Sequence, residues 1–233
     1  MKEAIVLAGG FGTRLQSVVS DVPKPMAPVA GRPFLTYLLD HLIPQGYGHV
    51  VLATGHLHEK VEAFFGNDYR GMRIDYAREL SPLGTGGAIL NALKHCTEEQ
   101  VTVLNGDTLF LVDHEELCRF ADEKKTSLAI VLRQVPDAGR YGAVEVDGDG
   151  LVTAFREKDP ATGAGLINGG IYRLHRSLLD GFVPGQQFSF EKELMQKRFR
   201  EEKFYAYASD GYFIDIGVPD DYARAQHELP LTH

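Results

Sequence analysis

Residues 7–35 read LAGGFGTRLQSVVSDVPKPMAPVAGRPFL and continue an apolar run that begins at Ala4. The run stops at Gly9, which is typical of a buried parallel strand with a glycine loop at its carboxyl end. Glycines let the backbone turn sharply and bring its N–H groups close to a ligand. Such N–H groups bind anions, phosphate above all. Because Arg14 and Lys24 add positive charge, the stretch predicts a phosphate-binding loop at the start of an α/β fold.

This loop differs from the two common phosphate-binding loops. No Lys-Ser or Lys-Thr pair follows Gly12, as the P-loop of nucleoside triphosphatases requires. No small residue follows Gly12 at the place where the dinucleotide-binding pattern G-x-G-x-x-G needs one for helix packing. An oxidoreductase with a dinucleotide cofactor is therefore disfavoured.

The stretch instead resembles the signature of the sugar-phosphate nucleotidyltransferases, L-A-[AG]-G-x-G-T-R-L followed by P-K-P, at residues 7–15 and 23–25. In that family the loop covers a nucleoside triphosphate, and its Arg and Lys hold the triphosphate and the incoming sugar phosphate. The resemblance implies catalytic roles for Arg14 and Lys24. It also implies nucleotide contacts by Leu7, Ala8, Gly9, Gly10, Gly12 and Thr13.

The composition narrows the class of protein. No apolar run approaches the roughly 20 residues that span a membrane, and the first strand leaves no room for a signal peptide. Cys96 and Cys118 lie far apart, which favours neither a disulfide framework nor a zinc site, so we expect a cytoplasmic protein. The net charge of −8 would repel nucleic acid, although a local basic cluster can still hold a nucleotide.

Apolar, β-branched segments alternate with amphipathic helical patterns as far as Leu132. This alternation predicts right-handed βαβ units and a parallel sheet. The first strand is followed by expected strands at His49–Ala53, Arg73–Ala77, Val101–Asn105 and Ser127–Leu132. The expected helices are Phe34–Gln45, His58–Phe65, Thr85–Lys94 and Asp113–Lys124.

Beyond Leu132 the pattern is that of an antiparallel or mixed extension over the exposed edge of the sheet. Residues 147–150, DGDG, predict a hairpin turn between strands at Gly142–Val146 and Leu151–Arg156. Further elements are expected at Gly169–Leu174, Phe204–Ala208 and Tyr212–Ile216, all strands, and at Pro219–Glu228, a helix. We therefore predict a Rossmann-like three-layer α/β sandwich, mainly parallel, with a sugar-binding extension. Residues 1–233 form a single domain in this reading, without the β-helix that several related enzymes carry.

A second glycine-bearing loop, ELSPLGTGG, occupies residues 79–87 just before a predicted helix. The resemblance places it beside the base and ribose, with contacts by Glu79, Pro82, Gly84 and Thr85. A carboxylate such as that of Glu79 can accept hydrogen bonds from both N1–H and the 2-amino group of guanine, whereas uracil and thymine offer one N–H. The alternative is that Glu79 is an ordinary exposed acid at the end of a strand, and related uridylyl enzymes can also carry Glu here.

Two aspartates are candidate metal ligands. Asp107 follows the most apolar strand, at the edge of the sheet where open α/β folds bind ligands, although Asp107 could instead cap the next segment. Asp215 lies between Ile214 and Ile216, where a buried carboxylate is costly unless it is paired or metal-bound. Both resemble the family's metal site, and hard oxygen ligands suit Mg²⁺. A glycosyltransferase D-x-D motif is disfavoured because Leu109 stands at its second position.

The sugar side of the site is expected in the second half of the chain. Glu157 and Lys158 resemble the family's Glu-Lys pair, which binds sugar hydroxyls and the sugar's phosphate. Taken alone, such a pair is commonly a solvated surface feature. The sugar-phosphate contacts that the resemblance implies are Gly142, Glu157, Lys158, Asn168 and Gly169. The nine histidines form no ligand pattern and are expected at the surface, as are Asp210, Asp220 and Asp221.

These features together predict an enzyme that joins a sugar 1-phosphate to a nucleoside triphosphate and releases pyrophosphate, with Mg²⁺ as cofactor. Residues 13–25 most resemble the D-glycero-D-manno-heptose 1-phosphate guanylyltransferases, which implies GTP and that heptose as substrates. The alternatives are mannose, glucose or N-acetylmuramate 1-phosphate with a guanylyl, uridylyl or thymidylyl group, or a non-catalytic nucleotide-binding module. A homo-oligomer is compatible with the sequence, and neither nucleic acid nor membrane is expected as a partner.

Overall fold

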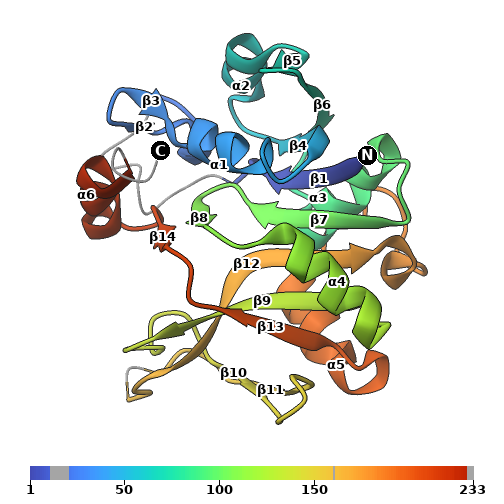
Figure 1. Ribbon diagram of the computed structural model, residues 1–233. Helices are drawn as coiled ribbons and strands as arrows, with labels where there is room; N and C mark the ends of the chain where they lie inside the picture. The colour runs from blue at the N-terminus through green and yellow to red at the C-terminus, as the bar shows by residue number, and fades with distance from the viewer. Residues whose placement is uncertain (11–20, 160, 230–233) are drawn as a thin grey trace.

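The computed structural model describes residues 1–10, 21–159 and 161–229, and an eight-stranded sheet in the order β13-β9-β12-β7-β1-β4-β6-β5 forms its centre (Figure 1). Its strands are β1 (Lys2–Leu7), β4 (Tyr47–Thr54), β5 (Asp68–Tyr69), β6 (Met72–Arg78), β7 (Gln100–Asn105), β9 (Leu128–Val135), β12 (Gly165–His175) and β13 (Tyr205–Ser209). The neighbours from β7 to β6 pair in parallel, as do β9 and β13. The predicted mainly parallel sheet is confirmed.

Three short antiparallel pairs lie outside the main sheet. They are β2 (Pro28–Val29) with β3 (Arg32–Pro33), β8 (Thr108–Phe110) with β14 (Phe213–Asp215), and β10 (Val144–Val146) with β11 (Val152–Phe155). The last pair is the hairpin that residues 147–150 predicted. The pairing of β8 with β14 places Asp215 opposite Thr108, although more than a hundred residues separate them in the chain.

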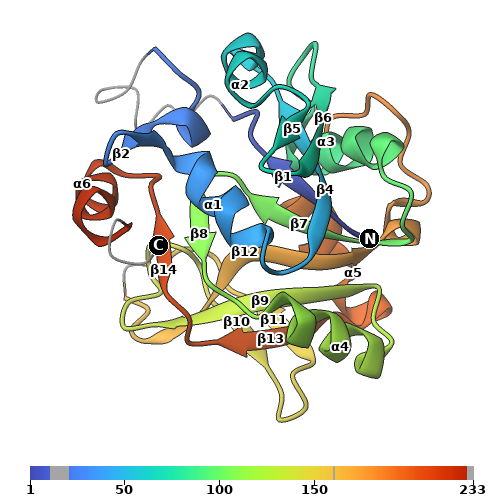
Figure 2. The ribbon, with the colours of Figure 1, turned by 45° about the horizontal axis from the view of Figure 1, so that its top comes forward.

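Helices cover both faces of the sheet (Figure 2). One face carries α1 (Phe34–Leu42), α2 (His58–Phe65), α4 (His114–Lys124) and α6 (Pro219–Glu228), and the other carries α3 (Gly84–Ala92), the π-helix η4 (Phe190–Met195) and α5 (Gln196–Glu202). The short 3-10 helices are η1 (Lys24–Met26), η2 (Leu93–His95) and η3 (Arg176–Leu179). Each face has its own apolar cluster, so the predicted three-layer sandwich is confirmed. Among the helices of the described chain, none combines the length and apolar character needed to cross a bilayer.

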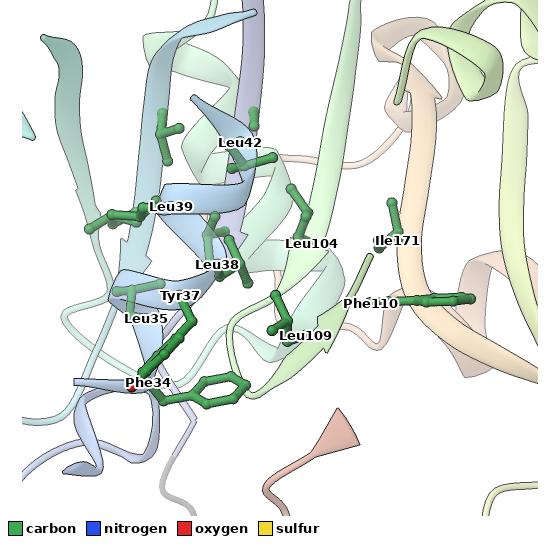
Figure 3. Close-up of a cluster of buried hydrophobic side chains, with 14 of the residues drawn as sticks. Phe34, Leu35, Tyr37, Leu38, Leu39, Leu42, Leu104, Leu109, Phe110 and Ile171 are labelled. Atoms are coloured by element: carbon green, nitrogen blue, oxygen red, sulfur yellow. The ribbon is translucent and has the colours of Figure 1, made fainter. Parts of the chain in front are cut away.

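On the first face, the apolar side of α1 packs against the sheet. Apolar residues recur along α1 at helical spacing, and Leu38, Leu39 and Leu42 are almost completely buried. Figure 3 shows this helix against Leu104 of β7 and Leu109 of β8. Each leucine removed from water in this way contributes about 1.5–3 kcal/mol, so this layer fixes the strands whose ends carry the site.

Several predicted boundaries shift by a few residues for local reasons. Helix α1 ends at Leu42, before Pro44, which has no N–H to continue it. Asp113 is the N-cap of α4 and not its first residue, because its side chain accepts hydrogen bonds from the backbone N–H groups of Glu115 and Glu116. Helix α3 ends at Ala92 and continues as η2.

The expected mixed pairing in the second half of the chain is confirmed, but the expected place of β12 is wrong, and one helical segment was not predicted. Strand β12 does not extend the sheet beyond its edge; it runs antiparallel between β7 and β9, inside the sheet. The helical segment from η4 through α5 was not predicted, because the wider turn of a π-helix breaks the 3.6-residue spacing of Phe190, Leu194 and Met195.

The expected surface positions are also wrong for two of the eight histidines that the structure describes. His49 lies buried between Glu3 and Asp75, with ring nitrogens 2.9 and 3.0 Å from their carboxylates. His114 is completely buried, and its Nδ1 lies 2.8 Å from the hydroxyl of Tyr47. Burial, and after it the neighbouring His41, lowers the pKa of His114 to about 3.

His114 is expected to make the fold sensitive to acid. Because its folded-state pKa lies below the unfolded value of about 6.5, the unfolded chain binds more protons between these two values, and the free energy of unfolding falls as pH is lowered through this window. The loss between pH 7 and pH 5 should be about 2 kcal/mol. Urea unfolding at both pH values should show a smaller loss for His114→Gln than for the natural chain; an equal loss would contradict this assignment.

Candidate active site

The ends of four parallel strands form a cavity of about 560 Å³. Strands β7, β1, β4 and β6 lie side by side in that order, and the chain after each one contributes to the cavity wall. From β1 the chain proceeds outward through β4 to β6 and then returns to β7 on the other side of β1. The cavity therefore lies at the reversal of strand order, where open α/β sheets bind ligands.

The first glycine loop reaches this cavity directly from β1. Leu7, Gly9 and Gly10 line it, whereas Ala8 is buried and bonds through its N–H to the carbonyl of Ala53. A side chain at Gly9 would lie 2.7 Å from Oε1 of Glu79 and 3.2 Å from the backbone nitrogen of Gly55, so glycine here lets the loop lie close to both. Gly12, Thr13 and Arg14 lie outside the described residues, and their assignments stay predictions.

The predicted catalytic lysine lies between the two predicted metal ligands. Nζ of Lys24 donates to Oδ2 of Asp107 at 2.5 Å and lies 3.8 Å from Oδ1 of Asp215. The prolines on either side of Lys24 hold it in η1, where Met26 N–H bonds to the carbonyl of Pro23 at 2.7 Å. The structure thus brings together three residues that the sequence separates by up to 191 positions, from residue 24 to residue 215.

Asp215 is held in an environment that disfavours its own charge. Burial, and after it the nearby Asp107, raises the pKa of the Asp215 carboxyl, while Lys24 and the N–H of Gly217 act in the opposite direction. The carboxylate lies between the buried Ile214 and Ile216 and is 29% exposed, so it is partly buried and has Lys24 within 3.8 Å as its positive partner. Two neighbouring carboxylates of this kind are stabilised by a cation placed between them.

Glycine and backbone contacts fix this arrangement. A side chain at Gly217 would lie 2.7 Å from Oδ1 of Asp215 and 2.9 Å from Nζ of Lys24. The N–H of Ile216 bonds to the backbone carbonyl of Asp107 at 3.0 Å. The two carboxylates are therefore held by a direct connection between their own strands, β8 and β14.

The second glycine loop forms the opposite wall through Glu79, Pro82, Gly84 and Thr85. Glu79 is half-buried, and its Oε2 accepts a hydrogen bond from the N–H of Leu83 at 2.9 Å. Burial raises the pKa of this carboxyl despite that bond. Glu79 is thus a hydrogen-bonded residue of the cavity wall and not an ordinary exposed acid. Leu80 beside it is fully exposed.

The glycines of this second loop serve packing as well as ligand access. Gly84 has a φ of +69°, and a side chain there would lie 2.5 Å from the carbonyl oxygen of Phe188. A side chain at Gly86 would lie 2.1 Å from the Phe188 ring. The segment before η4 therefore lies directly on the start of α3.

The predicted sugar residues form a second group next to the cavity. Gly142 has a φ of +84°, and a side chain there would lie 2.7 Å from the carbonyl of Arg156, beside the exposed Glu157 and Lys158. Asn168 donates to the hydroxyl of Tyr172 at 2.7 Å. A side chain at Gly169 would lie 2.6 Å from the ring of Phe110. The described lining of the cavity includes none of the five predicted sugar residues.

Sequence reasoning missed several residues of the cavity wall. His56 follows β4 and Asn105 ends β7, so the rule that found Asp107, position at a strand's carboxyl end, could have found both. Glu191 comes from η4 and had no signal in the sequence. The other missed wall residues are Pro25, Gly55, Leu80, Ser81 and Ala88.

Asp221 was expected at the surface, which is wrong. Its carboxylate is buried, and it accepts a hydrogen bond from Arg140 at 2.7 Å and lies 3.2 Å from a guanidinium nitrogen of Arg224. This ion-pair network connects α6 to the loop that carries Gly142.

Comparison with known proteins agrees with the geometry. The family model described as nucleotidyl transferase matches residues 3–230. A D-glycero-alpha-D-manno-heptose 1-phosphate guanylyltransferase of Aneurinibacillus thermoaerophilus is 47% identical over 97% of this chain and 98% of that protein. The protein of the same name from Campylobacter jejuni is 45% identical over 94% and 96%, respectively.

The chain is also similar in its fold to a solved structure. The crystal structure of HddC from Yersinia pseudotuberculosis, complexed with GMP-PN, has a TM-score of 0.86 and 34% identity and covers 98% of this chain and 99% of that chain. The glycine loop, the two carboxylates and the cavity at the reversal of strand order lie within the matched region. The chain is a member of the nucleotidyl transferase family.

Proposed function

We propose that this protein transfers a guanylyl group from GTP to D-glycero-α-D-manno-heptose 1-phosphate, forming GDP-heptose and pyrophosphate. The observation that carries this is identity of 47% and 45% over nearly the full length of two enzymes with that name. The cavity supports it, since it combines the glycine loop, Lys24 and Asp107 with a wall that carries Glu79, and Asp215 lies 3.8 Å from Lys24. Two free thiols, Cys96 and Cys118, are compatible with a cytoplasmic setting.

The reaction needs positioning and charge neutralisation more than acid–base chemistry. A phosphate monoester has a second pKa of about 6, so the sugar phosphate is largely dianionic at neutral pH and attacks without a general base. The difficulty is bringing two polyanions together in line. In this proposal Lys24 binds one reacting phosphate, Lys158 binds the sugar phosphate and Arg14 binds the departing pyrophosphate. The N–H groups of Gly9 and Gly10 are placed to bind the triphosphate.

Asp107 and Asp215 fit a divalent cation. Members of this family generally use such a metal, and we propose Mg²⁺. In the described ranges, no three metal-ligating side chains of His, Cys, Asp or Glu gather at one point, so the two carboxylates would share the ion with phosphate oxygens and water. Bound there, Mg²⁺ would supply positive charge to the phosphate oxygens of the transition state.

The substrate assignment is tested by competition. Equal concentrations of GTP, UTP, dTTP and CTP should yield mainly the GDP-sugar with heptose 1-phosphate, as measured by chromatography of the products. A preference for UTP or dTTP would contradict the guanine assignment. If GTP is preferred but mannose 1-phosphate reacts faster than the heptose, only the sugar assignment is wrong.

Glu79→Gln is expected to lower kcat/KM for GTP by roughly ten- to a hundredfold, with little loss for UTP. The glutamine oxygen can keep the hydrogen bond from Leu83, which leaves an amide donor facing the donors of guanine. The ratio of GTP to UTP activity isolates this effect from any general change in the loop. An unchanged ratio would mean that Glu79 only holds the loop.

A further inference from the structure

Glu191 is a carboxylate in the cavity wall to which the reaction above gives no role. It lies in η4, whose residues Phe190 and Leu194 are completely buried, so the helix is anchored in the core. Glu191 lines the same cavity as Lys24 and Asp107. An acidic group beside a site for two polyanions is unfavourable by charge alone, which makes its presence there informative.

The hydrogen bonds of Glu191 fix its carboxylate in one orientation. Thr85 donates to Oε2 at 2.7 Å and Ser189 donates to the same oxygen at 3.2 Å. Thr85 is held in turn by the N–H of Phe190 at 2.9 Å. Because both bonds that Glu191 accepts from described residues end on Oε2, Oε1 is left as a preorganised acceptor.

Phe190, the residue before Glu191, packs against β12, with its ring centroid 5.2 Å from that of Tyr172. Asn105, at the end of β7, lines the cavity and packs against Gly170, where a side chain would lie 2.7 Å from its amide nitrogen. Tyr172 of β12 bonds to Asn168, and its pKa is raised by burial and then by the charge of Glu191. Tyr172 thus connects the two regions, because its ring packs on Phe190, next to Glu191, and its hydroxyl bonds to the predicted sugar contact Asn168.

We propose that Oε1 of Glu191 accepts a hydrogen bond from a hydroxyl group of the sugar 1-phosphate and so contributes to the choice of sugar. This rests on the proposed function. Hydroxyl donors are what a carboxylate with a free oxygen needs, and a sugar carries several, whereas phosphates offer none. A site built around such a bond disfavours a sugar that lacks the hydroxyl, because the acceptor then loses its partner.

The test measures Glu191→Ala and Glu191→Gln with GTP, heptose 1-phosphate and a set of monodeoxy sugar 1-phosphates. Glu191→Ala should raise the KM for the sugar phosphate by roughly ten- to a hundredfold and leave the KM for GTP within about threefold. Glu191→Gln should have a smaller effect, since an amide also pairs with a hydroxyl. With the one analogue that lacks the contacted hydroxyl, natural chain and variant should have similar KM values.

Ser189→Ala is the matched control. It removes a donor to the same carboxylate but leaves the carboxylate in the cavity, so the KM for the sugar should stay within about threefold. Equal losses for Glu191→Ala with every deoxy analogue would show a purely structural role and overturn the proposal. A rise confined to the KM for GTP, absent with 2′-deoxy-GTP, would show a ribose contact and overturn it as well.

The proposed function can fail independently. If the natural chain rejects heptose 1-phosphate but accepts another sugar 1-phosphate, the same comparison is made with deoxy analogues of that sugar. The heptose assignment is then wrong. The role of Glu191 is still decided by whether the rise in KM caused by Glu191→Ala disappears with the analogue that lacks one particular hydroxyl. Thermal unfolding of each variant checks that the fold is retained.

Discussion

Asp107→Asn and Asp215→Asn are each expected to lower kcat by about 10³-fold, or roughly 4 kcal/mol of transition-state stabilisation. Both carboxylates lie within 3.8 Å of Nζ of Lys24, and asparagine keeps their shape but removes the charge that would hold a metal ion. The concentration of Mg²⁺ for half-maximal rate should rise in both variants, because a hard cation binds a neutral amide oxygen less well. Steady-state rates at increasing Mg²⁺ concentrations measure both effects.

Asp210→Asn provides the control for these variants. Asp210 precedes β14, but its side chain is 97% exposed and pairs only at 3.5 Å with Arg133, so its replacement should leave kcat and the Mg²⁺ dependence within about twofold. A kcat within fivefold of the natural chain for either asparagine variant, at saturating Mg²⁺, would rule out the two-carboxylate site.

Lys24→Ala is expected to lower kcat by about 10²- to 10³-fold while it lowers the Mg²⁺ concentration needed for half-maximal rate. The first effect follows from losing a buried positive charge beside the reacting phosphates. The second follows because Nζ of Lys24, at 2.5 Å from Asp107, competes with a metal ion for the same carboxylates. The Mg²⁺ requirement thus distinguishes Lys24 from a metal ligand. Loss of a metal ligand lowers kcat and raises the Mg²⁺ concentration needed for half-maximal rate, whereas loss of Lys24 lowers both.

Lys197→Ala, at an exposed position of α5, should change neither quantity. If Lys24→Ala instead raised the metal requirement, Lys24 would be helping to form the metal site and not competing for it. An unchanged kcat would mean that the lysine only neutralises the two aspartates in the absence of substrate.

Local signals were enough to predict one half of the site. The glycine loop follows β1 and Asp107 follows β7, and both strands are apolar. In an open α/β sheet the carboxyl ends of such strands meet where the strand order reverses, so no contact with a distant segment has to be known to predict this. Asp215 is different, because its place beside Asp107 depends on the pairing of β14 with β8, a contact between distant segments. The flanking Ile214 and Ile216 indicated that Asp215 needs a partner, but only the family resemblance indicated that it lies beside Asp107.

The features that the sequence did not predict depend on the fold as a whole. Strand β12 has the same apolar pattern whether it lies at an edge or between β7 and β9. Glu191 appears in an ordinary charged segment, and only the π-helical turn directs it to the cavity. Buried His49 and His114 could not be distinguished from surface histidines, because their partners come from distant strands and helices.

The antiparallel position of β12 has a consequence for how such enzymes can diversify. This strand carries the predicted sugar contact Asn168 and hydrogen-bonds to β7, which Asp107 follows by two residues, so the ladder register fixes the place of Asn168 relative to Asp107. A one-residue insertion there would turn every following side chain to the opposite face and separate sugar from nucleotide. Descendants of this chain that acquire new sugars should therefore change side chains within β12 at fixed length, and vary in length only in the β10–β11 hairpin and the loops around it.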